Sequence, residues 1–382
     1  MTPGTPASAP PLDATLWPLT ARVAATGHLE IAGMDVAALA RTYGTPLYLY
    51  DEATIRAQCQ DARSAFAAHW EASTVAYASK AYLSLALCRL LRDEGLALDA
   101  VSAGEVGLAL AAGFPPDQIH LHGNLKPDAE LRFALAAGVG RIVVDSLEEL
   151  DRVAALAAEA GRHQSIWLRV CPDVIAETHA ATRTGHAGSK FGLDLAGGEV
   201  DEAARRVRTM DSLDLVGLHA HIGSQLMDLA PLRRVVTLLC DCAASLRDRH
   251  GTRIREISPG GGLGVAYTPA DTPPDIATYG RQLAAALSAE VARIRIEPPR
   301  LVVEPGRAIV ARAGVALYTV GPRKRSPTGE VTLAVDGGLG DNPRTALYGA
   351  RYVAALVEHM SAPREEQVRV VGRYCESGDV LV

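Results

Sequence analysis

The sequence predicts an α/β fold: a closed (β/α)8 barrel, TIM-like, with a second and mostly β domain formed from both ends of the chain. Apolar strand-like runs alternate eight times with stretches of helical periodicity. The flanking segments show strand alternation and turns but little helix. An open doubly wound sheet is the alternative fold, although no Gly-x-Gly-x-x-Gly motif follows the first predicted strand.

Eight segments have the length and composition of buried strands. They are residues 75–80, 96–102, 119–124, 141–146, 165–170, 214–223, 254–260 and 300–306. Helical periodicity lies between them, for example over 147–160, and glycines such as Gly138 and Gly161 stand where helices should end.

The order of these patterns predicts four parts of the chain. Residues 1–19 are expected to be a disordered tail, because they are rich in Pro, Ala and Thr and lack periodicity. Residues 20–45 and 313–382 are expected to form the two parts of the β domain, and residues 46–312 the barrel.

Composition excludes several classes of protein. The 382 residues carry a net charge of -6, without the basic face that a nucleic-acid binder needs. No apolar run reaches the about 18 residues that span a bilayer, and the first residues lack the features of a signal peptide. The six cysteines show no zinc-type spacing. We therefore expect a cytoplasmic protein that binds neither nucleic acid nor membrane.

Polar residues follow the predicted strands at the point where each strand ends. Lys80 ends the first strand, His219 and His221 end the sixth, the glycines at 260–262 follow the seventh, and Glu304 ends the eighth. In a parallel barrel all carboxyl ends of the strands meet at one mouth, where active sites lie. These side chains should therefore converge.

Together these residues suit an aldehyde cofactor that carries a ring and a phosphate. A partly desolvated Lys80 could bind the aldehyde covalently, and the glycine turn could approach the phosphate. His221 could stack on the ring, and Glu304 could pair with its nitrogen.

Each residue also has a simpler interpretation. Lys80 could be a solvated surface residue, the glycines a flexible turn, and His221 a buried histidine with ordinary hydrogen bonds. Glu304 could form a salt bridge with Arg307. The His-x-His pattern invites a metal, but no further ligand follows at suitable spacing, so no metal is expected.

Ten motifs give the chain a strong resemblance to one family. They are AYASKA around Lys80, DAVSAGE (99–105), HGNLK (122–126), VVDSLEEL (143–150), SKFGL (189–193), HAHIGSQ (219–225), PGGGLGVAY (259–267), EPGR (304–307), VDGGLGDNPRTALYGARY (335–352) and CESGDVL (375–381). With these motifs the chain resembles the fold-type III pyridoxal-phosphate decarboxylases, the diaminopimelate and ornithine decarboxylase group, and within it the diaminopimelate branch.

The resemblance implies a role for each motif residue. Lys80 would bind pyridoxal 5'-phosphate covalently, His221 would stack on its ring, and Glu304 would keep its nitrogen protonated. The phosphate or the substrate carboxylate would be surrounded by Ser224, Gly261, Gly262 and Arg307. Cys375 would protonate the substrate carbon in the partner's site, so the resemblance also implies a homodimer with shared active sites.

The C-terminal motifs indicate which residues would bind the far end of the substrate. Arg344 and Glu376, with Tyr348 nearby, could hold the carboxylate and ammonium of a second amino-acid head. The resemblance thus implies decarboxylation of meso-diaminopimelate to L-lysine, the last step of lysine biosynthesis. A related decarboxylase for another diamino acid or polyamine precursor is the alternative, as is an impaired paralogue, because the family continues beyond CESGDVL and the β domain is expected to be truncated.

Overall fold

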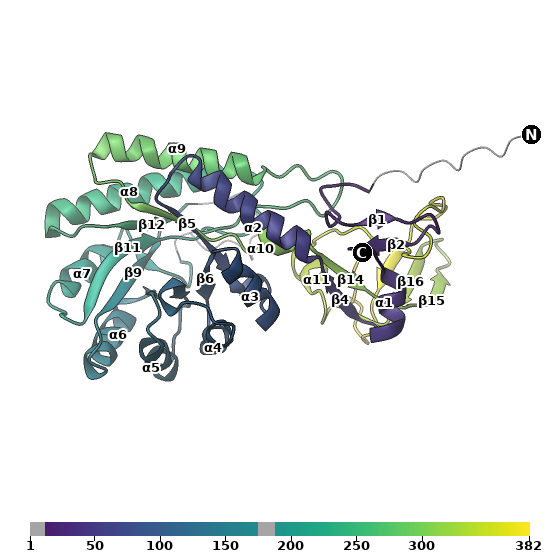
Figure 1. Ribbon diagram of the computed structural model, residues 1–382, viewed down its shortest axis with the longest axis horizontal. Helices are drawn as coiled ribbons and strands as arrows, with labels where there is room; N and C mark the ends of the chain where they lie inside the picture. Colours follow the sequence, from purple (N-terminus) through teal and green to yellow (C-terminus); the bar gives the residue numbers. More distant parts are fainter. Residues whose placement is uncertain (1–11, 175–187) are drawn as a thin grey trace, which may run out of the picture. The chain divides into compact units, whose positions relative to one another are not determined.

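The computed structural model describes residues 12–174 and 188–382, and these divide into two compact units (Figure 1). The first, here called the barrel unit, comprises Arg56–Gly264 and Pro273–Ile309. The second, the terminal unit, comprises Met1–Ile55, Val265–Thr272 and Val310–Val382. No helix of the described residues has both the length and the apolar character that a membrane span requires.

The barrel unit contains eight parallel strands that close on themselves. They are β5 (Ser73–Ala78), β6 (Ala97–Ala100), β7 (Ile119–Leu121), β8 (Arg141–Val144), β9 (Gln164–Cys171), β11 (Leu213–His219), β12 (Glu256–Ser258) and β13 (Arg300–Val303), with a short β10 (Leu193–Asp194) beside β9. Each pairs with the next, and β13 pairs with β5. The predicted closed barrel is confirmed, and the open sheet is wrong.

Helices alternate with these strands and surround them (Figure 1). They are α2 (Glu52–Ala67), η1 (Ser79–Ala81), α3 (Leu85–Asp93), α4 (Ala103–Ala111), η2 (Pro116–Gln118), α5 (Asp128–Ala137), α6 (Leu147–Glu159), α7 (Glu199–Val207), α8 (Ala230–His250), α9 (Ile276–Ile294) and α10 (Arg307–Val310).

Local sequence explains where several of these helices begin and end. Ser102 and Ser146 each follow a strand and cap the next helix, because each hydroxyl accepts the backbone N–H of a glutamate three residues later. At the other end of α5, Gly138 adopts a left-handed conformation (φ 75°), which other residues rarely do.

A layer of side chains within the barrel combines apolar and polar residues. Six strands each contribute one apolar residue to a buried cluster: Ala76, Ala97, Val143, Trp167, Val216 and Val302. The two remaining strands, β7 and β12, supply His120 and Glu256, and both contact Trp167. The indole N–H donates to Glu256 (2.6 Å), which explains how this carboxylate is accommodated inside the barrel.

The terminal unit is built from both ends of the chain. Its strands are β1 (Arg22–Val23), β2 (Leu29–Ile31), β3 (Met34–Asp35), β4 (Leu47–Tyr50), β14 (Gly314–Leu317), β15 (Val320–Arg325), β16 (Val331–Val335) and β17 (Arg369–Val371), and its helices are α1 (Val36–Tyr43) and α11 (Arg344–Tyr348). The early β4 pairs with the late β14. Leu29, Ile31, Val36 and Leu317 form its buried core.

The structure differs from the sequence-based expectation at several boundaries. The predicted strand 214–223 ends at His219, because the residues after it leave the sheet to form the mouth. The boundary before the barrel falls at Ile55 rather than at residue 45, since β4 pairs within the terminal unit. Residues 12–19 of the predicted tail instead form turns, in which the Asp13 carboxylate accepts from Thr15; residues 1–11 lie outside the described residues.

Candidate active site

Lys80 lies on η1, the short helix that directly follows β5 at the mouth of the barrel. It lines a cavity of about 430 Å³. The carboxylate of Glu105 fixes this segment, because it accepts from the Ser79 hydroxyl and from the backbone N–H of Val101, both at 2.6 Å. The end of β5 and the end of β6 are thereby joined beside the lysine.

The surroundings of Lys80 favour its neutral amine. The enclosing protein lowers the pKa of Lys80 by desolvation, and the nearby guanidinium of Arg169 adds to this, while Glu304 opposes it. The side chain nevertheless remains open to the cavity. A reachable lysine with a lowered pKa is a nucleophile suited to an aldehyde.

The turn that follows β12 requires glycine at positions 261 and 262. A Cβ on Gly261 would stand 2.0 Å from the carbonyl oxygen of Glu304, and one on Gly262 would stand 2.4 Å from that of Gly223. The turn therefore lies against the backbone that follows β11 and β13. This close packing brings three strand ends together, as a phosphate cradle requires.

Glu304 is a buried carboxylate held by two donors. His219 donates from Nε2 to one oxygen (3.1 Å), and the Ser258 hydroxyl donates to the other (2.5 Å). Burial alone would raise the pKa of Glu304, but the interaction with His219 brings it below its usual value. Burial lowers the pKa of His219 to about 4, against the opposing effect of Glu304. At neutral pH a carboxylate thus accepts from a neutral imidazole.

His221 is held as a neutral ring. The backbone N–H of Gly261 donates to its Nδ1 at 3.3 Å, so the ring proton lies on Nε2. Burial, then the charges of Lys80 and Arg169, lower its pKa well below the usual value. This ring therefore faces the cationic part of the mouth without a charge of its own.

Ser224 and Arg307 lie together in the barrel unit. Arg307 begins α10, and its Nη2 donates to the Ser224 hydroxyl at 3.0 Å. A hydroxyl next to a guanidinium is a suitable pair for an anionic oxygen.

Two further groups at the mouth were not predicted as site residues. Arg169 lies two residues before the end of β9, is buried, and its guanidinium carbon lies 4.2 Å from the ring centre of Phe191. Its position near the end of a predicted strand was the sequence signal that could have found it. Asp99, His120 and His122 form a buried cluster, and the ring of His122 contacts His219 at 4.9 Å between centroids. Only the folded barrel brings this cluster to Glu304.

The remaining predicted residues lie in the terminal unit. Arg344 begins α11, and its guanidinium lies 5.2 Å from the ring centre of Tyr348. Cys375 and Glu376 are exposed on the turn after β17. Among the described residues no arginine pairs with Glu376, whose carboxylate instead accepts from the backbone of Gly378 (3.3 Å).

A buried aspartate, Asp379, holds the turn that carries Cys375. One of its oxygens accepts from the backbone N–H of Leu339 and the other from that of Tyr374 (2.8 Å). The loop that precedes Arg344 and the turn with Cys375 are therefore fixed to the same carboxylate. Sequence reasoning quoted the motif that contains Asp379 but assigned it no role.

The structure thus separates the eleven predicted site residues into two groups. The barrel unit contains seven of them: Lys80, His221, Ser224, Gly261, Gly262, Glu304 and Arg307. The terminal unit contains four: Arg344, Tyr348, Cys375 and Glu376.

Known pyridoxal-dependent decarboxylases are similar to this chain. A model of the pyridoxal binding domain of pyridoxal-dependent decarboxylases matches residues 52–311. A diaminopimelate decarboxylase of Mycobacterium tuberculosis (strain ATCC 25618 / H37Rv) is 42% identical over 375 residues, which cover 96% of this chain and 83% of the relative. One of Bacillus subtilis (strain 168) is 41% identical, with 95% and 83% covered.

Solved structures give the same result. Diaminopimelate decarboxylase of M. jannaschii in complex with L-lysine superposes with a TM-score of 0.86 at 33% identity, covering 94% of this chain and 82% of that one. The Helicobacter pylori enzyme with L-lysine has a TM-score of 0.82 at 30% identity, with 91% and 84% covered. The resemblance seen in the motifs is confirmed.

Proposed function

The chain belongs to the pyridoxal-dependent decarboxylases, and from this premise we propose that it decarboxylates meso-diaminopimelate to L-lysine. Its cofactor is pyridoxal 5'-phosphate. The observation that carries the proposal is a lysine of lowered pKa at the same mouth as a glycine-only turn and an ionised Glu304. A nucleophile, a cradle for an anion and a partner for a protonated ring nitrogen are what this cofactor needs.

Residues of the barrel unit would hold the cofactor. Lys80 would bind the aldehyde carbon, His221 would lie against the ring, and Glu304 would keep the ring nitrogen protonated. The phosphate would be bound by Ser224, Gly261, Gly262 and Arg307. The bound cofactor supplies an electron sink for the bond that breaks when carbon dioxide leaves.

The protein's own groups would control protons and orientation. The lowered pKa of Lys80 would keep its Nζ a neutral nucleophile beside the bound cofactor. His219 and Ser258 hold Glu304 as a carboxylate, so that its charge is in place before substrate binds. The Sγ of Cys375 would give a proton to the carbon that lost its carboxylate.

The terminal unit would recognise the second amino-acid head of the substrate. Arg344 would bind its carboxylate and Glu376 its ammonium, with Tyr348 beside them. Support comes from the charges: Arg344 forms no ion pair with an acidic residue within the described ranges, and Glu376 is exposed. L-lysine keeps this head, and the names of two similar structures state that they contain L-lysine.

We further propose a homodimer in which Cys375 and Glu376 serve the partner's barrel, and a cytoplasmic location. The exposure of Cys375 supports the first, because an exposed thiol can be presented to another subunit. Six free cysteines support the second, since thiols persist in a reducing compartment.

A panel of amino acids tests the reaction directly. The purified protein with pyridoxal phosphate should release carbon dioxide from meso-diaminopimelate but not from L-lysine or L-ornithine. Release from another diamino acid alone would favour the related decarboxylase, and release from none, with the cofactor bound, would favour an impaired paralogue.

Mixing two inactive variants tests the shared site. Lys80→Ala and Cys375→Ala should each be inactive. After dissociation and reassociation the mixture should regain about a quarter of the original activity, because half the dimers are mixed and each keeps one intact site. No recovery, with dimers present, would contradict the sharing of sites.

A further inference from the structure

Three tyrosines surround the guanidinium of Arg344 in the terminal unit. The Nε–H donates to the hydroxyl of Tyr352 at 3.1 Å. The central carbon lies 5.2 Å from the ring centre of Tyr348 and 5.8 Å from that of Tyr267. Two of the rings also contact each other, since the centroids of Tyr267 and Tyr352 are 4.8 Å apart. Tyr267 and Tyr352 come from segments more than eighty positions apart and were not predicted as site residues.

The hydrogen bond to Tyr352 decides which edge of the guanidinium stays available. Arginine has five N–H donors, and a carboxylate can bind either along the edge that includes Nε or across the two terminal Nη groups. Tyr352 occupies Nε. The edge formed by Nη1 and Nη2 therefore remains for a carboxylate with two parallel oxygens.

The hydroxyl of Tyr352 is itself well fixed. The side chain is half-buried, and burial raises its pKa above the usual value, so the phenol keeps its proton at neutral pH. Asn342 lies near this hydroxyl and partly offsets the effect of burial on its pKa, and the Asn342 Oδ1 accepts the backbone N–H of Arg344 at 3.3 Å. The side chain of Arg344 is thus held by Tyr352, and its backbone by Asn342.

We infer that Tyr352 is a positioning residue that sets the orientation of Arg344 and thereby selects substrates whose far end bears a carboxylate. This inference rests on the proposed function, because it concerns the recognition of the second amino-acid head. Tyr267 and Tyr348 hold the faces of the guanidinium, and Tyr352 prevents rotation about its long axis. The carboxylate is then bound by Nη1 and Nη2 together.

The Tyr352→Phe variant tests the inference, because it removes one hydroxyl and keeps the ring. The KM for meso-diaminopimelate should rise roughly tenfold while kcat stays within about twofold, since a hydrogen bond to a charged group is lost away from the reacting atoms. Tyr318→Phe is the matched control: Tyr318 is another half-buried tyrosine of the terminal unit, and burial raises its pKa as it does that of Tyr352. It should leave KM unchanged.

Equilibrium binding gives a readout that does not depend on turnover. Calorimetry on the cofactor-loaded protein should show L-lysine binding roughly tenfold more weakly to Tyr352→Phe, and cadaverine, which lacks a carboxylate, binding unchanged. Equal weakening of both ligands would show that the hydroxyl only supports packing, and would overturn the inference. An unchanged affinity for L-lysine would overturn it as well.

These outcomes separate the inference from the proposed function. If the unaltered protein releases no carbon dioxide, the proposed reaction fails, yet the ratio of the two affinities still decides the role of Tyr352. If Tyr352→Phe does not fold, as thermal unfolding would show, Tyr267→Leu replaces it. That variant removes one aromatic face and should raise KM and weaken L-lysine alone by roughly threefold; no selective effect would again overturn the inference.

Discussion

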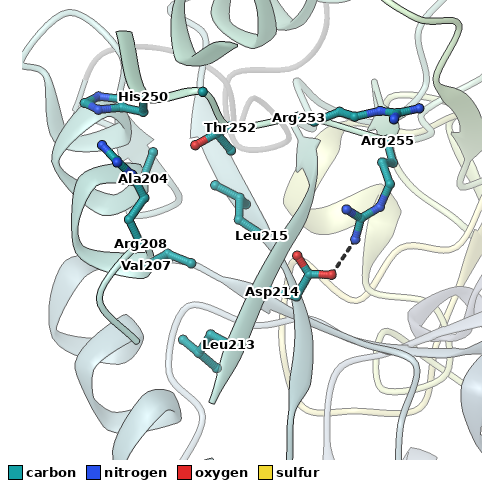
Figure 2. A pocket seen from close by; sticks show the side chains of 11 residues that line it. Ala204, Val207, Arg208, Leu213, Asp214, Leu215, His250, Thr252, Arg253 and Arg255 are labelled. Carbon is teal, nitrogen blue, oxygen red and sulfur yellow. Dashed lines mark hydrogen bonds and ion pairs between the residues drawn. The ribbon is translucent and has the colours of Figure 1, made fainter. Parts of the chain in front are cut away.

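Two cavities of the barrel unit differ in how their charged residues are arranged. The cavity beside Lys80 lies at the carboxyl ends of the strands. Another, of about 300 Å³, lies where β11 and β12 begin, and includes His250, Arg253 and Arg255 among its lining residues (Figure 2). Figure 2 shows Arg255 paired with Asp214. His250 likewise pairs with Asp201 (2.7 Å), and Arg253 with Glu297.

The two cavities show how the pairing of charged residues differs between a candidate ligand-binding site and an ordinary protein surface. At the amino ends of the strands Arg253 and Arg255 each pair with a carboxylate, Glu297 and Asp214 respectively, and such exposed pairs contribute little to stability. At the carboxyl ends Lys80 forms no ion pair with an acidic residue of the described ranges, and the carboxylate of Glu304 is held by neutral donors. Charges that remain available there can act on a ligand.

The largest expected effect is that of Lys80→Ala, which removes the nucleophile from the first cavity. Carbon dioxide release should fall by roughly a thousandfold or more, and the visible absorbance of the lysine-bound cofactor should disappear. Spectroscopy and a carbon dioxide assay check this. A variant that keeps the absorbance would show that another amine binds the cofactor.

A smaller effect is expected for Glu304→Gln, which removes the charge and keeps the shape. We expect kcat to fall roughly a hundredfold, because a neutral amide cannot keep a ring nitrogen protonated. Cofactor should still bind through Lys80. The control is Glu256→Gln, in a barrel carboxylate bonded to Arg141 and Trp167, which should alter stability but leave kcat of the folded protein within about twofold.

The buried His219 at the mouth of the barrel should make the free energy of unfolding depend on pH. His219 has a pKa of about 4 in the folded protein and near 6.5 when unfolded. Between these values the unfolded chain binds more protons, so the free energy of unfolding should fall as pH falls from about 6.5 to 4, by up to about 1.4 kcal/mol per pH unit.

Denaturant titrations across this pH window measure that slope. His219→Gln should flatten it, because the difference in proton binding between the unfolded and the folded chain is then removed at this position. An unchanged slope in His219→Gln would mean that this histidine keeps its proton in the folded protein.

The smallest effect is expected in the second cavity. Arg255→Ala breaks an exposed ion pair with Asp214, so the free energy of unfolding should change by less than about 1 kcal/mol, and kcat and KM should not change. A clear loss of turnover in this variant would contradict the view that only the cavity beside Lys80 takes part in the reaction.

Much of the fold could be predicted because buried parallel strands and their turns leave clear patterns. All eight strands were found, but for seven of them the C-terminal end was predicted too late, β9 being the exception. The segment 254–260 contains only the three residues of β12, because Pro259 and Gly260 have left the ladder. Apolar and small residues continue into the mouth, so composition alone does not show where the hydrogen bonding stops.

The candidate site was predicted less completely. Lys80, His221 and Glu304 stand at strand ends and belong to recognisable motifs, so they could be selected individually. Tyr352, by contrast, acts through its hydrogen bond to Arg344, and Asp99 through its position near His122 and Glu304. Such roles depend on contacts between side chains that are distant in the sequence. The spacing of residues along the chain does not predict these contacts.

The sequence by itself determined the kinds of chemical group available, the alternation that builds a barrel, and the family to which those motifs belong. Only the tertiary structure decided that Glu304 is held by His219 and Ser258, that the glycine turn contacts two other strand ends, and that Tyr352 occupies one edge of Arg344. The reason is physical: local periodicity follows from neighbouring residues, whereas a carboxylate's partners and the desolvation of an amine depend on strands that meet only when the barrel closes.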